Sequence, residues 1–223
     1  GFNRMAAGLE ERERIRGLFG RQVGEDVART AIAGDSELGG ETREVGVVFV
    51  DVIGSTTLAA TRPPDEVVDV LNRFFAVVVD VVHTHGGFVN KFEGDAALAV
   101  FGAPIALDHA AAAALGAARA MAARLAAEVV ECEAGIGASY GPAVAGNVGA
   151  EARYEYTVIG DPVNEAARLS DLAKTVSGRV VAAGRALAAA AGTDEASHWV
   201  TGDEVVLRGR GEPTVLATPT AVP

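Results

Sequence analysis

Short apolar runs and long amphipathic stretches alternate along residues 45–140 in an order that few folds can accommodate. The Val-rich run at the start predicts a buried strand. Acidic residues after a Pro-Pro pair and glycines at the far end delimit a long helix, and an Ala-rich stretch predicts a second one. The expected elements are a strand at 45–50, a helix at 65–85, strands at 88–92 and 96–101, a helix at about 107–128 and a strand at 133–140.

This order of strand, helix, strand, strand, helix, strand is that of the split βαβ, ferredoxin-like arrangement. Right-handed crossovers would place both helices on one face of an antiparallel sheet. The remaining chain predicts a hairpin around 144–156, a helix at about 162–174 and two or three further strands. The expected fold class is therefore α+β, with a ferredoxin-like βαββαβ core and an extra C-terminal helix and strands.

An N-terminal helical segment is expected to precede this core. Residues 1–34 are densely charged, and their sparse apolar positions have spacings that suit a helix. Gly34–Glu41 is a linker by composition, because Gly, Asp and Ser favour turns. We therefore expect a helical segment with its linker at 1–40 and one domain at 41–223. The helix is either a solvated helix without a function of its own or a dimerising helix, since a sparse apolar stripe needs a partner surface.

Charge and composition exclude several classes of protein. The 223 residues include 19 basic and 30 acidic side chains, a net charge of −11, which argues against nucleic-acid binding. An acidic protein can still handle an anionic substrate when metal ions lie between the two. No apolar run approaches the roughly 20 residues that cross a bilayer. The single Cys132 excludes an intrachain disulfide, and the absence of an initial Met indicates a piece of a longer protein.

Two aspartates are expected to meet at one edge of the sheet. Asp51 lies at the end of the first strand, and Asp95 lies in the hairpin turn between the second and third strands. These strands are neighbours in a split βαβ sheet, so the two carboxylates can converge as a pair of hard divalent cations requires. Gly54, Ser55 and Thr56 follow and offer backbone N–H groups to phosphate oxygens. Taken singly, Asp51 could instead be a helix N-cap and Asp95 an ordinary hairpin residue.

A second informative segment runs from Tyr156 to Leu169. Pro162 suits the first turn of a helix, which places Asn164 and Arg168 four residues apart on one face. An amide and a guanidinium so placed can both point at one group. The alternative is a surface helix in which Arg168 pairs with Glu165 or Asp171 at helical spacing.

Four short segments stand out along most of residues 45–170. In chain order they are Val48–Thr56, Asn90–Asp95, Gly135–Pro142 with Gly146–Gly149, and Thr157–Arg168. In this order they resemble the catalytic domain of the class III nucleotidyl cyclases, and more specifically the bacterial homodimeric adenylyl cyclases. Each motif is short, but their shared order on the expected topology makes the resemblance specific.

The resemblance implies a role for each matching position. Asp51 and Asp95 correspond to the aspartates that bind two divalent cations, Mg²⁺ or Mn²⁺, with the Val52 carbonyl as a further ligand. Lys91 and Thr157 correspond to the pair that recognises the purine, and Thr157 indicates a Lys/Thr subgroup. The remaining positions match the asparagine that orients the ribose, the arginine that stabilises the transition state and a triphosphate-binding cation near the C-terminus: Asn164, Arg168 and Arg210.

The resemblance also implies a substrate and a partner. A lysine donor and a hydroxyl acceptor match the N1 acceptor and 6-amino donor of adenine, whereas guanine presents the opposite pattern. Because a site rejects a base that leaves buried polar groups unpaired, we expect an adenylyl cyclase that converts ATP to 3′,5′-cyclic AMP and pyrophosphate. We also expect a homodimer whose active sites are shared between protomers.

Two alternatives stay open at this point. One is a guanylyl cyclase, and the other is a catalytically silent nucleotide-binding regulatory domain, although no metal-binding, ribose-binding or transition-state position is missing. A diguanylate cyclase is disfavoured, because its Gly-Gly-Asp/Glu-Glu-Phe signature is absent. Residues 2–16 resemble the end of a HAMP-type signalling helix, which in this family often links membrane helices to the cyclase. That resemblance implies the cytoplasmic domain of a membrane-anchored protein, with residues 15–34 as a helical coupler.

Overall fold

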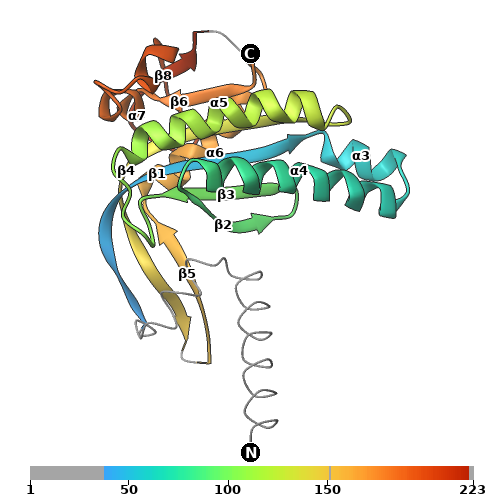
Figure 1. Cartoon of the computed structure of the whole chain (residues 1–223), viewed down its shortest axis with the longest axis horizontal. Helices are drawn as coiled ribbons and strands as arrows, with labels where there is room; N and C mark the ends of the chain where they lie inside the picture. The colour runs from blue at the N-terminus through green and yellow to red at the C-terminus, as the bar shows by residue number, and fades with distance from the viewer. Residues whose placement is uncertain (1–37, 151, 221–223) are drawn as a thin grey trace, which may run out of the picture.

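The computed structural model describes residues 38–150 and 152–220, and the predicted N-terminal helix lies outside these residues. The core elements follow the expected order (Figure 1). They are β1 (Gly39–Ile53), α3 (Ser55–Thr61), α4 (Pro64–Thr84), β2 (Phe88–Glu93), β3 (Ala96–Phe101), α5 (Ala110–Glu128), β4 (Glu133–Ala150), β5 (Arg153–Ile159) and α6 (Asp161–Ala173). The C-terminal part contains β6 (Val180–Ala183), α7 (Gly184–Ala189), the 3-10 helix η1 (Glu195–His198), β7 (Trp199–Val205) and β8 (Thr214–Pro219).

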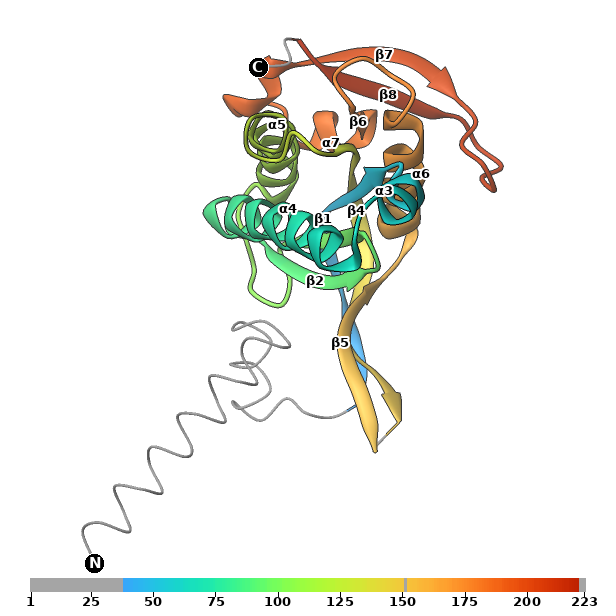
Figure 2. The ribbon, with the colours of Figure 1, turned by 90° about the vertical axis from the view of Figure 1, so that its right-hand side faces the viewer.

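The strands form one eight-stranded sheet in the order β2-β3-β1-β4-β6-β8-β7, with β5 paired to β4 beside this path. Strand β1 pairs antiparallel with both β3 and β4, which is the predicted split βαβ core. The α+β fold class is therefore confirmed. Figures 1 and 2 show that β4 and β5 continue as a long hairpin that reaches away from the layer of α4 and α5.

Strands β1 and β4 are much longer than their apolar centres predict. They pair over their whole shared length, from Gly39 opposite Asn147 to Ile53 opposite Glu133. The polar stretch Glu41–Glu44 belongs to β1 because it pairs with β4. The preference of a residue for a strand depends strongly on such pairing. The sequence analysis also did not predict the short helix α3.

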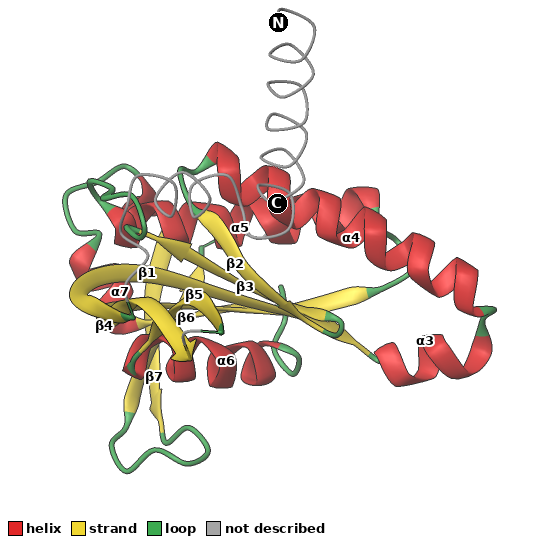
Figure 3. Ribbon diagram, turned by 90° about the horizontal axis from the view of Figure 1, so that it is seen from below, coloured by secondary structure: helices red, strands yellow, loops and turns green. Residues whose placement is uncertain are grey.

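The helices form layers on opposite faces of the sheet, as Figure 3 shows. Alternate β1 residues face opposite ways: Val48 and Val50 belong to the core that α4 and α5 cover, whereas Val47 belongs to the core on the side of α6. The expectation that the two long helices share one face is confirmed. Asp51 has the parity of Val47 and therefore faces the α6 side.

Helix α6 lies directly on β4 because two glycines in that strand leave room for it. A Cβ atom at Gly137 would lie 2.1 Å from the carbonyl oxygen of Ala166, and one at Gly135 would lie 2.4 Å from that of Ser170. Such separations are impossible for real atoms, so a side chain at either position would push α6 away. These glycines thus fix the height of α6 over the sheet next to the end of β1.

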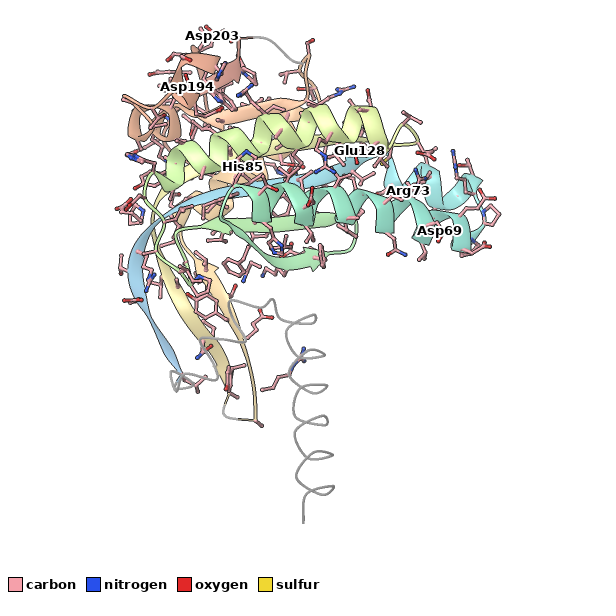
Figure 4. The ribbon with its side chains drawn as sticks, in the orientation of Figure 1. Asp69, Arg73, His85, Glu128, Asp194 and Asp203 are labelled. Carbon is pink, nitrogen blue, oxygen red and sulfur yellow. The ribbon has the colours of Figure 1, made fainter. Side chains whose placement is uncertain are left out.

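Ion pairs join α4 to α5 and to the segment that follows α5 on their exposed side, where Figure 4 labels Arg73 and Glu128. Arg73 of α4 bonds both carboxylate oxygens of Glu131, at 3.2 and 2.6 Å. Arg124 of α5 bonds Glu128 and also Asp80 of α4. In the described part of the chain, α5 is the one helix long and apolar enough to cross a membrane. It is a core helix here, because much of its surface packs against α4 and the sheet.

Candidate functional site

The structure places Asp51 beside the hairpin that carries Asp95. Asp51 lies opposite Ala96 in the β1–β3 register, and the N–H of Val52 donates to the carbonyl oxygen of Asp95 at 3.4 Å. Burial raises the pKa of the Asp51 carboxyl, and the negative charge of Asp95 adds to this effect, whereas the Lys174 ammonium opposes it. The two carboxylates are thus close enough to repel each other, as groups that share a cation do.

Asp51 does not cap the following helix. The N-cap of α3 is Gly54, whose φ of 72° lies in the left-handed region that glycine tolerates. Gly54, Ser55 and Thr56 therefore turn the chain directly after the strand that carries Asp51. Gly54 and Thr56 are exposed there. Their proposed contact with phosphate oxygens stays a prediction.

A cationic side chain lies against Asp51. The ammonium of Lys174, just after α6, forms an ion pair with Asp51 and lies 3.3 Å from Asp171. Within residues 38–150 and 152–220, no group of three or more His, Cys, Asp or Glu side chains could hold a metal ion. Asp51, Asp95 and the Val52 carbonyl therefore form a partial, all-oxygen donor set, to which nucleotide phosphates and water would add. Donors that are all oxygen atoms fit Mg²⁺ or Mn²⁺.

Replacing Lys174 with Met is expected to tighten Mn²⁺ binding by about tenfold, because the variant keeps the apolar stem but removes a competing positive charge. Electron paramagnetic resonance titration of free Mn²⁺ measures this affinity. The matched control is Arg73→Met, since Arg73 of α4 pairs with Glu131 rather than with Asp51. Equal Mn²⁺ affinity in the wild type and the Lys174 variant would contradict the assignment of this cation site.

The predicted base-recognition pair comes from two strands that lie side by side. Lys91 is on β2, where its ammonium lies 3.3 Å from Glu93, and Thr157 is buried on β5. Asn90 links the two strands: its Nδ2 donates to the carbonyl oxygen of Tyr156 at 2.9 Å, and its Oδ1 accepts from the Thr157 hydroxyl at 3.2 Å. Asn90, the neighbour of Lys91 in sequence, thus contacts Thr157 directly within one chain.

Asn164 and Arg168 lie on the exposed face of α6. Arg168 pairs only loosely with Asp171, at 3.8 Å, and 46% of its side chain is exposed. Of the two partners considered from the sequence, Asp171 is the one that Arg168 reaches, because Glu165 faces inward and is only 2% exposed. The arginine is therefore available to an incoming anion.

Glu165 is the centre of a buried polar cluster at the start of α6. Its carboxylate accepts hydrogen bonds from Ser139 of β4 at 2.6 Å, from Arg185 of α7 at 2.6 Å and from Thr214 of β8 at 3.1 Å. Arg210 lies 3.3 Å from the same carboxylate. The cluster ties α6 to three other elements and so holds the face that presents Asn164 and Arg168.

Arg210 is engaged within the chain. It donates to both carboxylate oxygens of Asp161, at 2.5 and 3.0 Å, and this bond holds the pKa of Asp161 below its usual value. Its Nε is buried without a hydrogen-bond partner among the described residues. Binding of a triphosphate by Arg210 would have to compete with Asp161, and this role stays a prediction.

Replacing Glu165 with Gln is expected to lower the free energy of unfolding by about 2 kcal/mol, because an amide replaces the buried carboxylate that accepts a charge-assisted hydrogen bond from Arg185. Asp161 remains as a counter-charge for Arg185 and Arg210. Urea denaturation followed by circular dichroism measures the change. The matched control is Glu155→Gln on β5, where the side chain is exposed and the expected change is within about 0.5 kcal/mol. A loss no larger than that of the control would show that the cluster does not hold α6.

Sequence reasoning missed three of these residues. Lys174 carried a signal, because lysine occurs only at positions 91 and 174. Glu165 appeared in the sequence only as a possible partner of Arg168, and Asn90 only as the first residue of a matching segment. No local pattern indicates their hydrogen-bond partners, because these are distant in sequence. A cavity of about 500 Å³ between the end of α5 and residues 175–179 is lined by residues other than the predicted site residues.

Comparison with known proteins gives consistent matches. A family model described as the adenylate and guanylate cyclase catalytic domain matches residues 39–217. Uncharacterized protein Mb1354c of Mycobacterium bovis is 58% identical over 219 residues, 98% of this chain and 38% of that protein. The chain spans about two fifths of the length of the curated relatives it matches.

Two solved structures similar to this chain are named for different activities, one as a guanylyl cyclase and one as an adenylyl cyclase. The guanylyl cyclase Cya2 has a TM-score of 0.73 and 30% identity, over 83% of this chain and 96% of that one. A bacterial light-regulated adenylyl cyclase has a TM-score of 0.83 and 21% identity, over 98% of this chain and 64% of that one, which shows the fold alone. These matches do not decide between ATP and GTP.

Proposed function

Since the chain belongs to the adenylate and guanylate cyclase catalytic domain family, we propose that it converts ATP to 3′,5′-cyclic AMP and pyrophosphate at a site shared between two copies of the chain. The observation that carries the proposal is the proximity of Asp51 to Asp95 at the end of β1, where the Lys174 ammonium already forms an ion pair with Asp51. Domains of this class generally use divalent metal ions. When bound, such ions would polarise the ribose 3′-hydroxyl and neutralise the phosphates.

The side chains would then act mainly by position and charge. Arg168 is expected to stabilise the negative charge that develops on the transferring phosphoryl group, and Asn164 to orient the ribose so that its 3′-oxygen attacks the α-phosphorus in line. Asp51 and Asp95 hold the cations. Charge placement of this kind is the dominant contribution in phosphoryl transfer, where little covalent chemistry is left for the protein.

ATP is the proposed substrate because of the base-recognition pair. The Lys91 ammonium can only donate, which suits the adenine N1, and the Thr157 hydroxyl can accept from the 6-amino group. A guanylyl cyclase is the second candidate, and the 30% identity with a guanylyl cyclase structure favours it. The presence of Lys91 and Thr157 supports ATP, because guanine offers N1–H and O6 at the corresponding positions.

A second copy of the chain is the proposed partner. Asn164 and Arg168 are exposed on α6, so one chain alone does not enclose them. The β4–β5 hairpin also exposes apolar side chains: Val144, Val148, Tyr154 and Ile159. The β4–β5 register places Val144, Val148 and Ile159 on one face of the hairpin. An exposed apolar face suits an interface between copies. We also propose that residues 2–16 are the end of a HAMP-type signalling helix linked to membrane helices upstream, and that residues 15–34 are a helical coupler.

Turnover of each nucleotide tests the proposal. The full chain is incubated with ATP or GTP in Mg²⁺ or Mn²⁺, and cyclic nucleotide and pyrophosphate are quantified separately. The expected result is equimolar cyclic AMP and pyrophosphate from ATP, with GTP turned over at least about tenfold more slowly. Cyclic GMP as the main product would support the guanylyl alternative, and a folded dimer that cyclises neither nucleotide would be a silent regulatory domain.

A further inference from the structure

We infer that Asn90 determines the preference for adenine, because it fixes the Thr157 hydroxyl as a hydrogen-bond acceptor toward the nucleotide. This inference rests on the proposed function and names a residue that the resemblance assigns no role. Asn90 is half-buried and lies between Lys91 on its own strand and Thr157 on β5. It is a positioning residue, since it acts on the base through Thr157.

A bulge in β2 directs Asn90 toward β5. The register with β3 shifts between Val89 and Lys91, so that Val89 lies opposite Ala99 and Lys91 lies opposite Leu98. Asn90 is the extra residue. A bulge re-aims side chains that would otherwise alternate strictly between the faces. At this bulge the Asn90 side chain reaches Tyr156 and Thr157 of β5.

The aromatic neighbours of Asn90 show that β2 and β5 are held together there. The rings of Phe88 on β2 and Tyr156 on β5 lie 6.2 Å apart in an edge-to-face arrangement. Asn90 forms its two hydrogen bonds next to this contact, with the backbone of Tyr156 and the side chain of Thr157. Figure 2 shows the upper part of β5 beside β2. The contact between the strands is therefore anchored by packing as well as by polar bonds.

The orientation of the Asn90 amide follows from its partners. The carbonyl oxygen of Tyr156 can only accept a hydrogen bond, so the amide group 2.9 Å from it must be the NH₂ group. The Asn90 oxygen then faces the Thr157 hydroxyl at 3.2 Å, and an amide oxygen can only accept. The Thr157 hydroxyl must therefore donate its single proton to Asn90.

This hydrogen bond removes an ambiguity in base recognition. A free hydroxyl can donate to guanine O6 as readily as it accepts from the adenine 6-amino group. Once its proton is committed to Asn90, Thr157 has only lone pairs to offer, and it is only 6% exposed. Guanine would then place O6 against an acceptor in a buried position, which discriminates strongly against it. The selectivity for ATP thus depends on Asn90 as well as on Thr157.

The test measures the affinities of the full chain for 3′-deoxy-ATP and 3′-deoxy-GTP with Mn²⁺ by calorimetry. These nucleotides lack the attacking hydroxyl, so binding is read without turnover. We expect the wild type to favour the adenine nucleotide, and Asn90→Leu to reduce this preference by about tenfold, chiefly by tighter binding of the guanine nucleotide. Asn90→Gln keeps the amide donor and acceptor on a longer side chain and is expected to retain more of the preference than the leucine variant. If the leucine variant does not fold, Asn90→Ser replaces it, because serine is too short to make both bonds.

A double-mutant cycle separates positioning from general damage. In a Thr157→Val background, Asn90→Leu is expected to leave the preference unchanged, since the hydroxyl through which Asn90 acts is gone. Equal loss of both affinities in Asn90→Leu, or a further change in the double variant, would overturn the inference. A wild type that binds both nucleotides equally would also overturn it.

The same samples distinguish this inference from the proposed function. ATP turnover is assayed in parallel with binding. A chain that binds 3′-deoxy-ATP selectively through Asn90 but forms no cyclic AMP would support the inference and overturn the proposed cyclase activity. A chain that cyclises ATP but whose preference does not depend on Asn90 would do the reverse. A folded chain that binds neither nucleotide would overturn both.

Discussion

Replacing Asp51 with Asn is expected to lower the rate of ATP cyclisation by about 1000-fold or more, because the variant keeps the side-chain shape but loses the charge that holds a divalent cation. Steady-state assays of cyclic AMP formation in Mg²⁺ and in Mn²⁺ measure the loss. Folding should be preserved, since the Lys174 ammonium keeps Asp171 as a partner. Thermal unfolding followed by circular dichroism checks this.

The matched control is Asp69→Asn. Asp69 is an exposed aspartate on α4, labelled in Figure 4, on the opposite side of the sheet from α6. Its replacement should leave the turnover of ATP within about twofold of the wild-type rate, as for most surface substitutions. If Asp51→Asn retained activity comparable with this control, Asp51 would not be a cation ligand, and the pairing with Asp95 would be structural.

Replacing Arg168 with Ala is expected to lower kcat by about 100- to 1000-fold with little change in KM, because the guanidinium would act on charge that develops in the transition state. The structure supports an arginine that is free to move, since its one ion pair within the described residues is the 3.8 Å contact with Asp171 on an exposed face. The loss of this contact should hardly affect stability, because exposed pairs contribute little.

Two further variants sharpen this prediction. Arg168→Lys keeps the charge without the planar fork and should fall between the wild type and the alanine variant. Arg208→Ala removes an exposed arginine from the loop between β7 and β8 and serves as the matched control. A raised KM with unchanged kcat in Arg168→Ala would show that Arg168 binds the ground state instead. Unchanged values of both would remove it from the site.

The sequence was most informative where local signals determine structure. Pro64 and the acidic first turn of α4 are at the predicted helix start, and the tight turn before Ala96 brings Asp95 to the end of β1. The proximity of the two aspartates then follows from strand order alone. For this reason the topology and the proposed metal site could be predicted together.

Long-range interactions set the limit of that prediction. Glu165 lies 20 residues from Arg185 and 49 from Thr214, so no local pattern indicates its buried cluster. Asn90 depends on a bulge, which requires both strands to be known. Arg210 matched a family position, yet its engagement with Asp161 could be seen only in the structure. Local periodicity carries no information about such partners.

Mixing two inactive variants tests the central claim of a shared active site most directly. An Asp51→Ala chain and an Asn164→Ala chain are each expected to form no cyclic AMP. If one site takes its carboxylates from one copy and Asn164 from the other, a heterodimer of the two variants contains one intact site. Random pairing of equal amounts should restore about a quarter of the wild-type rate. Absence of cyclic AMP in a sample whose heterodimers are demonstrated by differential tags would contradict the account.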